Sequence, residues 1–157
     1  MSEYVKIQAA TASELAKEID FSEDRAVTLF DPQDHPVTAV KKLFAGECFI
    51  DGLRLLAHAL PKREAVWWAC LAVRHTLENE QSEDGQALVA AEAWARQPME
   101  SNRLQCKTIA EKLKFKTAAA WAAMSAAWST GSITEEGQPK VAPPEKLYAH
   151  AVGGAVS

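Results

Sequence analysis

Alanine is the residue that most constrains how this chain can fold. The 157-residue sequence contains 29 alanines, mostly in runs with Leu, Glu, Lys and Trp. Alanine favours helices because its side chain loses no conformational entropy there, whereas Ile and Tyr, which favour strands, are scarce. We therefore expect an all-α fold, a single-domain irregular helical bundle of about seven or eight helices joined in consecutive hairpins.

The polarity of the sequence changes after residue 36. Residues 1–36 are polar and acidic, and they are predicted to hold one short helix that begins at a capping box formed by Thr11 and Glu14. The remainder of this segment is expected to be a loop with room for an extended stretch. Residues 37–157 carry a Trp- and Ala-rich helical pattern without a fixed repeat, so they are expected to form the main domain.

Glycine, proline and capping residues divide the main domain into helices. Gly46 is expected to stop the first helix in the left-handed conformation, and Pro61 to turn the chain inside a helical hairpin. Ser82 and Thr117 are predicted caps of later helices. The expected helices cover approximately residues 37–45, 47–60, 62–79, 86–97, 101–114, 118–130 and 145–156.

Apolar spacing predicts which helix faces are buried. The helix over 62–79 is apolar around so much of its surface that it is expected to have neighbours on at least two sides. Trp94 is expected in the core. The predicted buried stripes are Leu53, Leu56, Ala57 and Leu60; Val66, Cys70, Val73 and Leu77; and Trp121, Met124 and Trp128.

The charge balance argues against nucleic-acid binding. Seventeen basic residues are scattered among 21 acidic ones, which gives a net charge of −4, whereas nucleic-acid binders concentrate positive charge. The densest basic stretch, residues 107–116, is interpreted as a solvated helix end. The sequence also lacks a signal-peptide pattern and a membrane-spanning apolar run. Three cysteines, an odd number in apolar stretches, are best explained as buried reduced thiols, so a cytoplasmic protein is expected.

The residues that could carry chemistry form no convincing set. Cys70 with His58 or His75 is the nearest approach to a nucleophile or a metal site, but its apolar setting favours an inert thiol. The carboxylate sets have simpler explanations as exposed helix-end, loop or turn residues: Glu47 with Asp51, Glu135 with Glu136, and Asp31 with Asp34 and His35. We therefore expect no enzyme activity, no cofactor and no metal ion.

The tryptophans are the strongest indication of a binding surface. Trp67 and Trp68 are adjacent, so they point about 100° apart on their helix. Both are buried only if that helix is flanked on two sides; otherwise one of them marks an interaction patch. The predicted protein-binding surface consists of this pair and the residues around the Pro61 turn: His58, Lys62, Arg63, Glu64, Trp67 and Trp68.

The sequence around this turn resembles a known family. The block His-Ala-Leu-Pro at 58–61, followed by Arg-Glu-Ala-Val-Trp-Trp-Ala-Cys at 63–70, is similar to an uncharacterised family of small bacterial proteins associated with type VI secretion system gene clusters. The resemblance extends over residues 37–157. Thr130 departs from it, because a second glycine is usual before Gly131, and the 135–138 loop is poor in proline. The other matching stretches are 90–94, 118–123, 127–132, 143–144 and 151–156.

This resemblance implies a cytoplasmic accessory protein without catalytic residues. Its expected role is that of an adaptor or chaperone for a component of the secretion spike or for an effector. An immunity protein that blocks a cognate toxin is one alternative. A small effector or hydrolase that uses Cys70 or the acidic residues is another.

Overall fold

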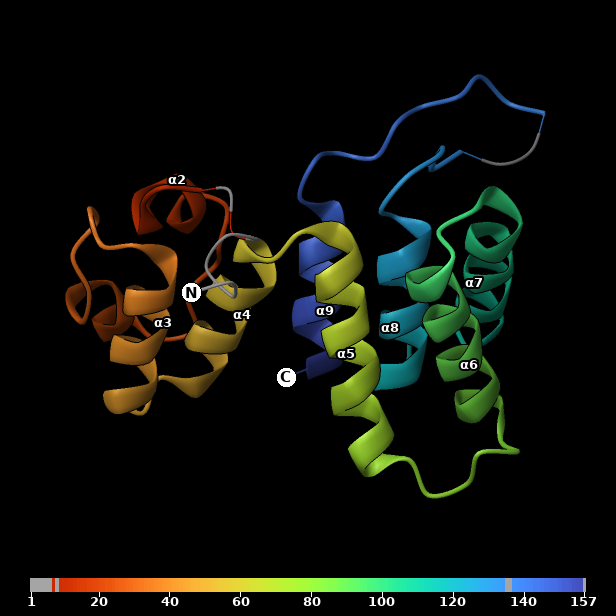
Figure 1. Cartoon of the computed structure of the whole chain (residues 1–157), viewed down its shortest axis with the longest axis horizontal. Coiled ribbons are helices and arrows are strands. Elements are labelled where there is room, and N and C mark those ends of the chain that lie inside the picture. Colours follow the sequence, from red (N-terminus) through yellow and green to blue (C-terminus); the bar gives the residue numbers. More distant parts are fainter. Residues whose placement is uncertain (1–6, 8, 135–136, 157) are drawn as a thin grey trace. The chain divides into compact units, whose positions relative to one another are not determined.

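The structure is a computed structural model that describes residues 7, 9–134 and 137–156. Within these residues it contains eight α-helices, one 3-10 helix and no strand, which confirms the all-α helical bundle (Figure 1). The helices gather into two compact units. Unit 1 extends to Pro61 and unit 2 covers Lys62–Val156, whereas the polarity of the sequence changes earlier, after residue 36.

Unit 1 is built around two packed helices. These are α3 (Pro36–Ala45) and α4 (Phe49–Ala59), and the shorter α2 (Ala12–Ala16) contacts both. The acidic loop contains the 3-10 helix η1 (Asp24–Thr28) in place of an extended stretch. Ala26 and Phe30 of this region are buried in the core of unit 1.

Two local predictions in unit 1 are wrong. Thr11 makes no side-chain cap bond at the start of α2, because its hydroxyl contacts the side chains of Ser13 and Glu14 instead. Gly46 has a φ of −87°, and the left-handed residue after α3 is Glu47 with a φ of 63°. A Cβ atom at Gly46 would lie 2.6 Å from a methyl group of Leu29, so a larger residue there would shift the end of the Leu29 side chain.

The buried face of α4 also differs from the predicted stripe. Leu53, Leu56 and Leu60 are half-buried, while Leu55 is fully buried. Gly52 explains this rotation, because a Cβ atom on it would lie 2.4 Å from the Phe44 ring of α3. The absent side chain lets α3 approach that side of α4.

Unit 2 surrounds the alanine-rich helix α8 (Ala118–Ala127). This helix packs against α5 (Lys62–Thr76), α6 (Glu83–Arg96), α7 (Glu100–Lys112) and α9 (Leu147–Val156). Eight of its ten residues are buried, and six of these are alanines. Small side chains therefore let four helices approach one. Trp121, predicted in the core, is only half-buried, as is Trp128 just beyond the helix.

Other predictions for unit 2 are confirmed. Ser82 accepts a hydrogen bond from the Gly85 amide, and Thr117 accepts one from the Ala120 amide. Helix α5 contacts α6, α8 and α9, and Trp94 is only 2% exposed. All three cysteines are buried. No helix within the described residues is long and apolar enough to cross a membrane.

Candidate functional site

The predicted binding residues lie in both units. Lys62, Arg63, Glu64, Trp67 and Trp68 occupy the first two turns of α5 in unit 2, and His58 lies near the end of α4 in unit 1. The His58 side chain is 2% exposed, and its Nδ1 lies 2.9 Å from the carbonyl oxygen of Arg54. The binding surface itself stays a prediction.

Arg63 and Trp67 join α5 to the end of α6. The Arg63 guanidinium donates to the carbonyl oxygens of Ala95 and Arg96, two of the carbonyls that a helix leaves unpaired at its C-terminus. The Arg96 guanidinium in turn lies 5.7 Å from the centre of the Trp67 ring, in the range of a cation–π contact. Arg63 and Trp67, which both contact the end of α6, therefore stabilise unit 2.

The α5 surface still presents apolar area beside these contacts. Trp67 and Trp68 are both half-buried, and Leu71 in the next turn is 47% exposed. Residues three and four positions apart share a helix face, so Leu71 lies beside both tryptophans. We call Trp67, Trp68 and Leu71 the α5 patch.

A second aromatic surface lies along α8. The Phe115 and Trp121 ring centres are 5.5 Å apart, and the Trp121 and Trp128 ring centres are 6.2 Å apart in an edge-to-face arrangement. Phe115 is 37% exposed, and the two tryptophans are half-buried. We call these three residues the aromatic row. Sequence reasoning missed it by placing both tryptophans in the core; their seven-residue spacing was the available signal.

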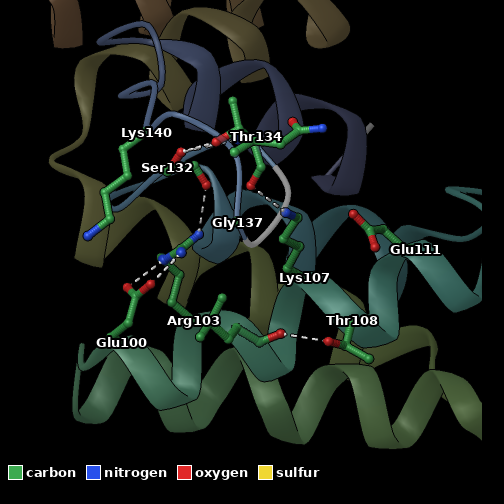
Figure 2. A pocket seen from close by; sticks show the side chains of 11 residues that line it. Glu100, Arg103, Lys107, Thr108, Glu111, Ser132, Thr134, Gly137 and Lys140 are labelled. Atoms are coloured by element: carbon green, nitrogen blue, oxygen red, sulfur yellow. Dashed lines mark hydrogen bonds and ion pairs between the residues drawn. The ribbon is translucent and has the colours of Figure 1, made fainter.

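A polar pocket of about 350 Å³ lies between α7 and the segment that follows α8 (Figure 2). Three of its charged side chains, Glu100, Arg103 and Lys107, make internal bonds. Lys107 donates to the carbonyl oxygen of Thr134, and Arg103 contacts Glu100 and Ser132. The lining residues are Glu100, Arg103, Leu104, Lys107, Thr108, Glu111, Ser132, Thr134, Gly137, Gln138 and Lys140.

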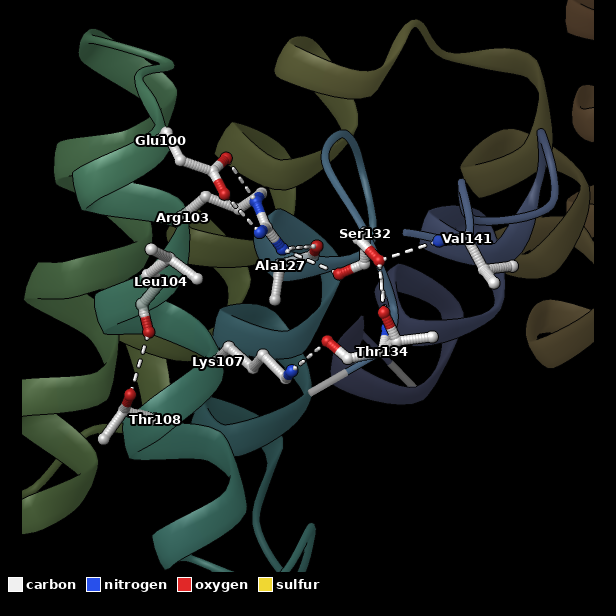
Figure 3. A network of polar contacts seen from close by, with 9 residues as sticks. All are labelled: Glu100, Arg103, Leu104, Lys107, Thr108, Ala127, Ser132, Thr134 and Val141. Atoms are coloured by element: carbon white, nitrogen blue, oxygen red, sulfur yellow. Dashed lines mark hydrogen bonds and ion pairs between the residues drawn. The ribbon is translucent and has the colours of Figure 1, made fainter. Parts of the chain in front are cut away.

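Arg103 is the centre of this polar network (Figure 3). It is 3% exposed, and its guanidinium bonds both carboxylate oxygens of Glu100 and the carbonyl oxygens of Ala127 and Ser132. The bond from this guanidinium lowers the pKa of the Glu100 carboxyl. These bonds tie α7 to the end of α8, so the pocket wall is structural.

The thiols of unit 2 are poor nucleophiles. Burial raises the pKa of Cys70 to about 12, and it raises the pKa of Cys106 to about 12 as well. Both thiols are therefore protonated near neutral pH, whereas a nucleophilic cysteine reacts as the thiolate. In unit 1, the hydrogen bond from Cys48 to Glu23 is the main reason that the pKa of Cys48 is raised.

The carboxylate sets have structural contacts. Asp51 was predicted to be solvent-exposed, but it is fully buried and accepts hydrogen bonds from the amides of Ser22 and Glu23. Asp34 accepts from the Asp31 amide and from Lys42. Glu135 and Glu136 lie outside the described residues. No group of three or more His, Cys, Asp or Glu within the described chain could hold a metal ion.

The comparisons with known proteins identify a family whose function is unknown. Searches against curated proteins and against solved structures give no match. A family model matches residues 39–157, a range that includes the α5 patch and the aromatic row. Because this range covers well over half of the chain, the protein belongs to a family of unknown function (DUF6931).

Proposed function

We propose that this chain is a non-catalytic accessory protein that binds another protein through tryptophan-bearing helical surfaces. In the setting implied by the sequence resemblance, it acts as an adaptor or chaperone for a type VI secretion spike component or effector. The observation that carries this proposal is the placement of the tryptophans. Four of the five are only half-buried, while Trp94 alone is enclosed.

Partly exposed tryptophans favour protein binding over a purely structural role. Tryptophan contributes a large apolar area and is enriched at the energetic centres of protein interfaces. In this chain the half-buried tryptophans stand on or next to closely packed helices, so little conformational entropy would be lost when a partner binds. Leu71, 47% exposed beside Trp67 and Trp68, extends the apolar area of the α5 patch.

The chemistry of the thiols gives the hydrolase alternative less support. A cysteine hydrolase needs a thiolate near neutral pH. Burial holds the pKa of Cys70 and that of Cys106 at about 12.

The test is recovery of a native complex from the host. The tagged full-length chain is expressed at its natural level, purified under gentle conditions, and the co-purifying proteins are identified and quantified by mass spectrometry. A stoichiometric spike component or effector is the expected result. Recovery of the chain alone from cells with an assembled secretion system would overturn the proposal.

Two matched variants connect this complex to the α5 patch. Leu71→Glu places a charge in the patch, and Val89→Glu places one at a 57% exposed position of α6. We expect only Leu71→Glu to reduce recovery of the partner, with both variants folded by circular dichroism. If the recovered partner is a toxin and the chain rescues cells from it, the immunity alternative replaces the adaptor role.

A further inference from the structure

We propose that the aromatic row binds an acidic segment of a partner protein that also carries apolar side chains. This inference rests on the proposed function, because it assigns a surface and a partner chemistry to it. Three observations carry it: the partial exposure of the three rings, a glycine beside Trp121, and lysines on both sides of Phe115.

The three rings form a continuous apolar strip. Phe115 contacts Trp121 and Trp121 contacts Trp128, so a bound segment can reach all three rings without a break. Phe115 reaches this position from a short left-handed turn, in which Lys114 has a φ of 54° and Phe115 a φ of 58°. Residues other than glycine rarely adopt this left-handed backbone conformation. The backbone therefore holds Phe115 outside α7 and beside α8.

Gly154 leaves one side of the Trp121 ring open. This residue of α9 is exposed, and a Cβ atom on it would lie 3.4 Å from two atoms of the Trp121 indole. That distance is an ordinary van der Waals contact, so the fold has space for a side chain here. The position nevertheless carries none, and the indole beneath it is accessible to an apolar side chain of a partner.

Two exposed lysines flank Phe115 at one end of the row. Residues 107–116 contain four lysines, but Lys107 lines the polar pocket and donates to the carbonyl oxygen of Thr134. Lys114 and Lys116 flank Phe115 and are exposed, while Lys112 lies 3.5 Å from Glu83. Exposed charges act over a Debye length of about 8 Å at physiological salt. Asp84 accepts a hydrogen bond from the hydroxyl of Thr117, the residue after Lys116, so the attraction for a carboxylate comes from Lys114 and Lys116 beside Phe115 and not from the whole row.

A protein segment fits these features better than a nucleic acid does. Aromatic rings next to lysines also occur in single-strand binding surfaces. Such surfaces follow a long phosphate backbone with many positive charges, whereas the basic stretch here is confined to residues 107–116 of an acidic chain. A short acidic segment with apolar anchors needs only that local charge.

The experiment selects the partner chemistry without a prior choice of peptide. The full-length chain is used to select binders from a phage-displayed library of random peptides, and the selected peptides are measured by fluorescence anisotropy. We expect enrichment of Asp and Glu together with Phe, Trp or Leu, and binding that weakens as salt is added.

Two variants test whether these peptides bind at the aromatic row, and neither removes a packed side chain. Gly154→Gln covers the Trp121 ring, and Lys116→Glu reverses a flanking charge. We expect Gly154→Gln to abolish detectable binding and Lys116→Glu to weaken it about tenfold, since repulsion replaces attraction. The matched controls are Val89→Gln on α6 and Lys140→Glu after α8, both at exposed positions. They should bind as the unmodified chain does.

Several results would overturn the inference. These are failure to select any peptide, enrichment of basic or uncharged peptides, equal binding by Gly154→Gln, and tighter binding of a single-stranded oligonucleotide to the same face. Recovery of a native partner that binds Gly154→Gln normally would reject the aromatic row but leave the proposed function standing. Peptide selection on the row without a native partner would reject only the proposed function.

Discussion

Two glycines of unit 2 respond in opposite ways to an added side chain. Gly131 has a φ of 73°, and a Cβ atom there would lie 2.4 Å from Nε of Arg103. Gly154 lies within α9, where its backbone accepts any side chain and the nearest indole atom is 3.4 Å away. The effect of an added side chain therefore depends on the backbone conformation of each glycine and on the atoms beside it.

We expect Gly131→Ala to destabilise the protein by more than about 1 kcal/mol, because it strains the backbone and displaces a buried guanidinium. We expect Gly154→Ala to stabilise it by about 0.5–1 kcal/mol, because alanine loses less entropy in a helix. Urea unfolding followed by circular dichroism measures both. Equal effects of the two substitutions would contradict this assignment.

The buried thiols make stability depend on pH in the alkaline range. An unfolded thiol loses its proton near pH 9, whereas burial raises the pKa of Cys70 and of Cys106 in the folded chain to about 12. Below pH 9 both states are protonated and the stability is fully present. From pH 9 to pH 12 deprotonation favours the unfolded state, so we expect the free energy of unfolding to fall across that window.

Urea unfolding at a series of pH values measures this loss. Burial also raises the pKa of Tyr148 to about 12, which adds to the loss above pH 10. The double variant Cys70→Ala with Cys106→Ala should therefore show a smaller decline. A decline identical in the variant would remove the thiols as its cause. Native thiols should also react slowly with a thiol reagent at pH 8.

At the scale of elements, α8 is the helix on which unit 2 depends. It contacts four other helices, and Ala122 and Ala123 are fully buried within it. Helices approach closely only where side chains are small, so added volume here has no space to enter. The alanine content that predicts helices thus also determines how tightly they pack.

We expect Ala123→Leu to destabilise the protein by about 1–3 kcal/mol or more, because it overpacks the centre of unit 2. Ala118→Leu is the matched control, since Ala118 is exposed at the start of the same helix. Thermal and urea unfolding should show a loss for Ala123→Leu and little change for Ala118→Leu. Equal stability of the two variants would contradict the central position of α8.

The sequence predicts the helices of this chain better than their orientation. Capping side chains and proline act locally, so the starts at Ser82 and Thr117 follow from neighbouring residues. The buried face of a helix depends on remote partners instead. An alanine-rich helix is apolar on every side, and its spacing does not reveal that Trp121 lies at the surface while the alanines are enclosed.

The candidate surfaces show the same division. The angular separation of Trp67 and Trp68 predicts burial of both on a helix flanked on two sides and exposure of one otherwise; α5 contacts three helices, yet both tryptophans are half-buried. The role of Arg63 was not accessible in this way, because its acceptors, the carbonyls of Ala95 and Arg96, are more than thirty positions away in the sequence. Nor was burial of Arg103, which requires the carbonyls of Ala127 and Ser132.

For the whole molecule, the division after Pro61 leads to a final prediction. The helices that contact α8 all belong to unit 2, and Trp94, Cys70 and Cys106 form part of its buried interior. A fragment of residues 62–157 therefore keeps the complete set of helices around the central one. Burial of apolar area within such a set is the main source of folding free energy.

We expect this fragment to fold as a monomeric helical domain. Far-ultraviolet circular dichroism should show helices, and urea should unfold them in one cooperative transition. Ala123→Leu should destabilise the fragment as it does the whole chain, because the substitution acts inside unit 2. A fragment with helices but no cooperative transition would mean that unit 1 is required to complete the core. In that case residues 1–61 contribute to the free energy of folding of unit 2.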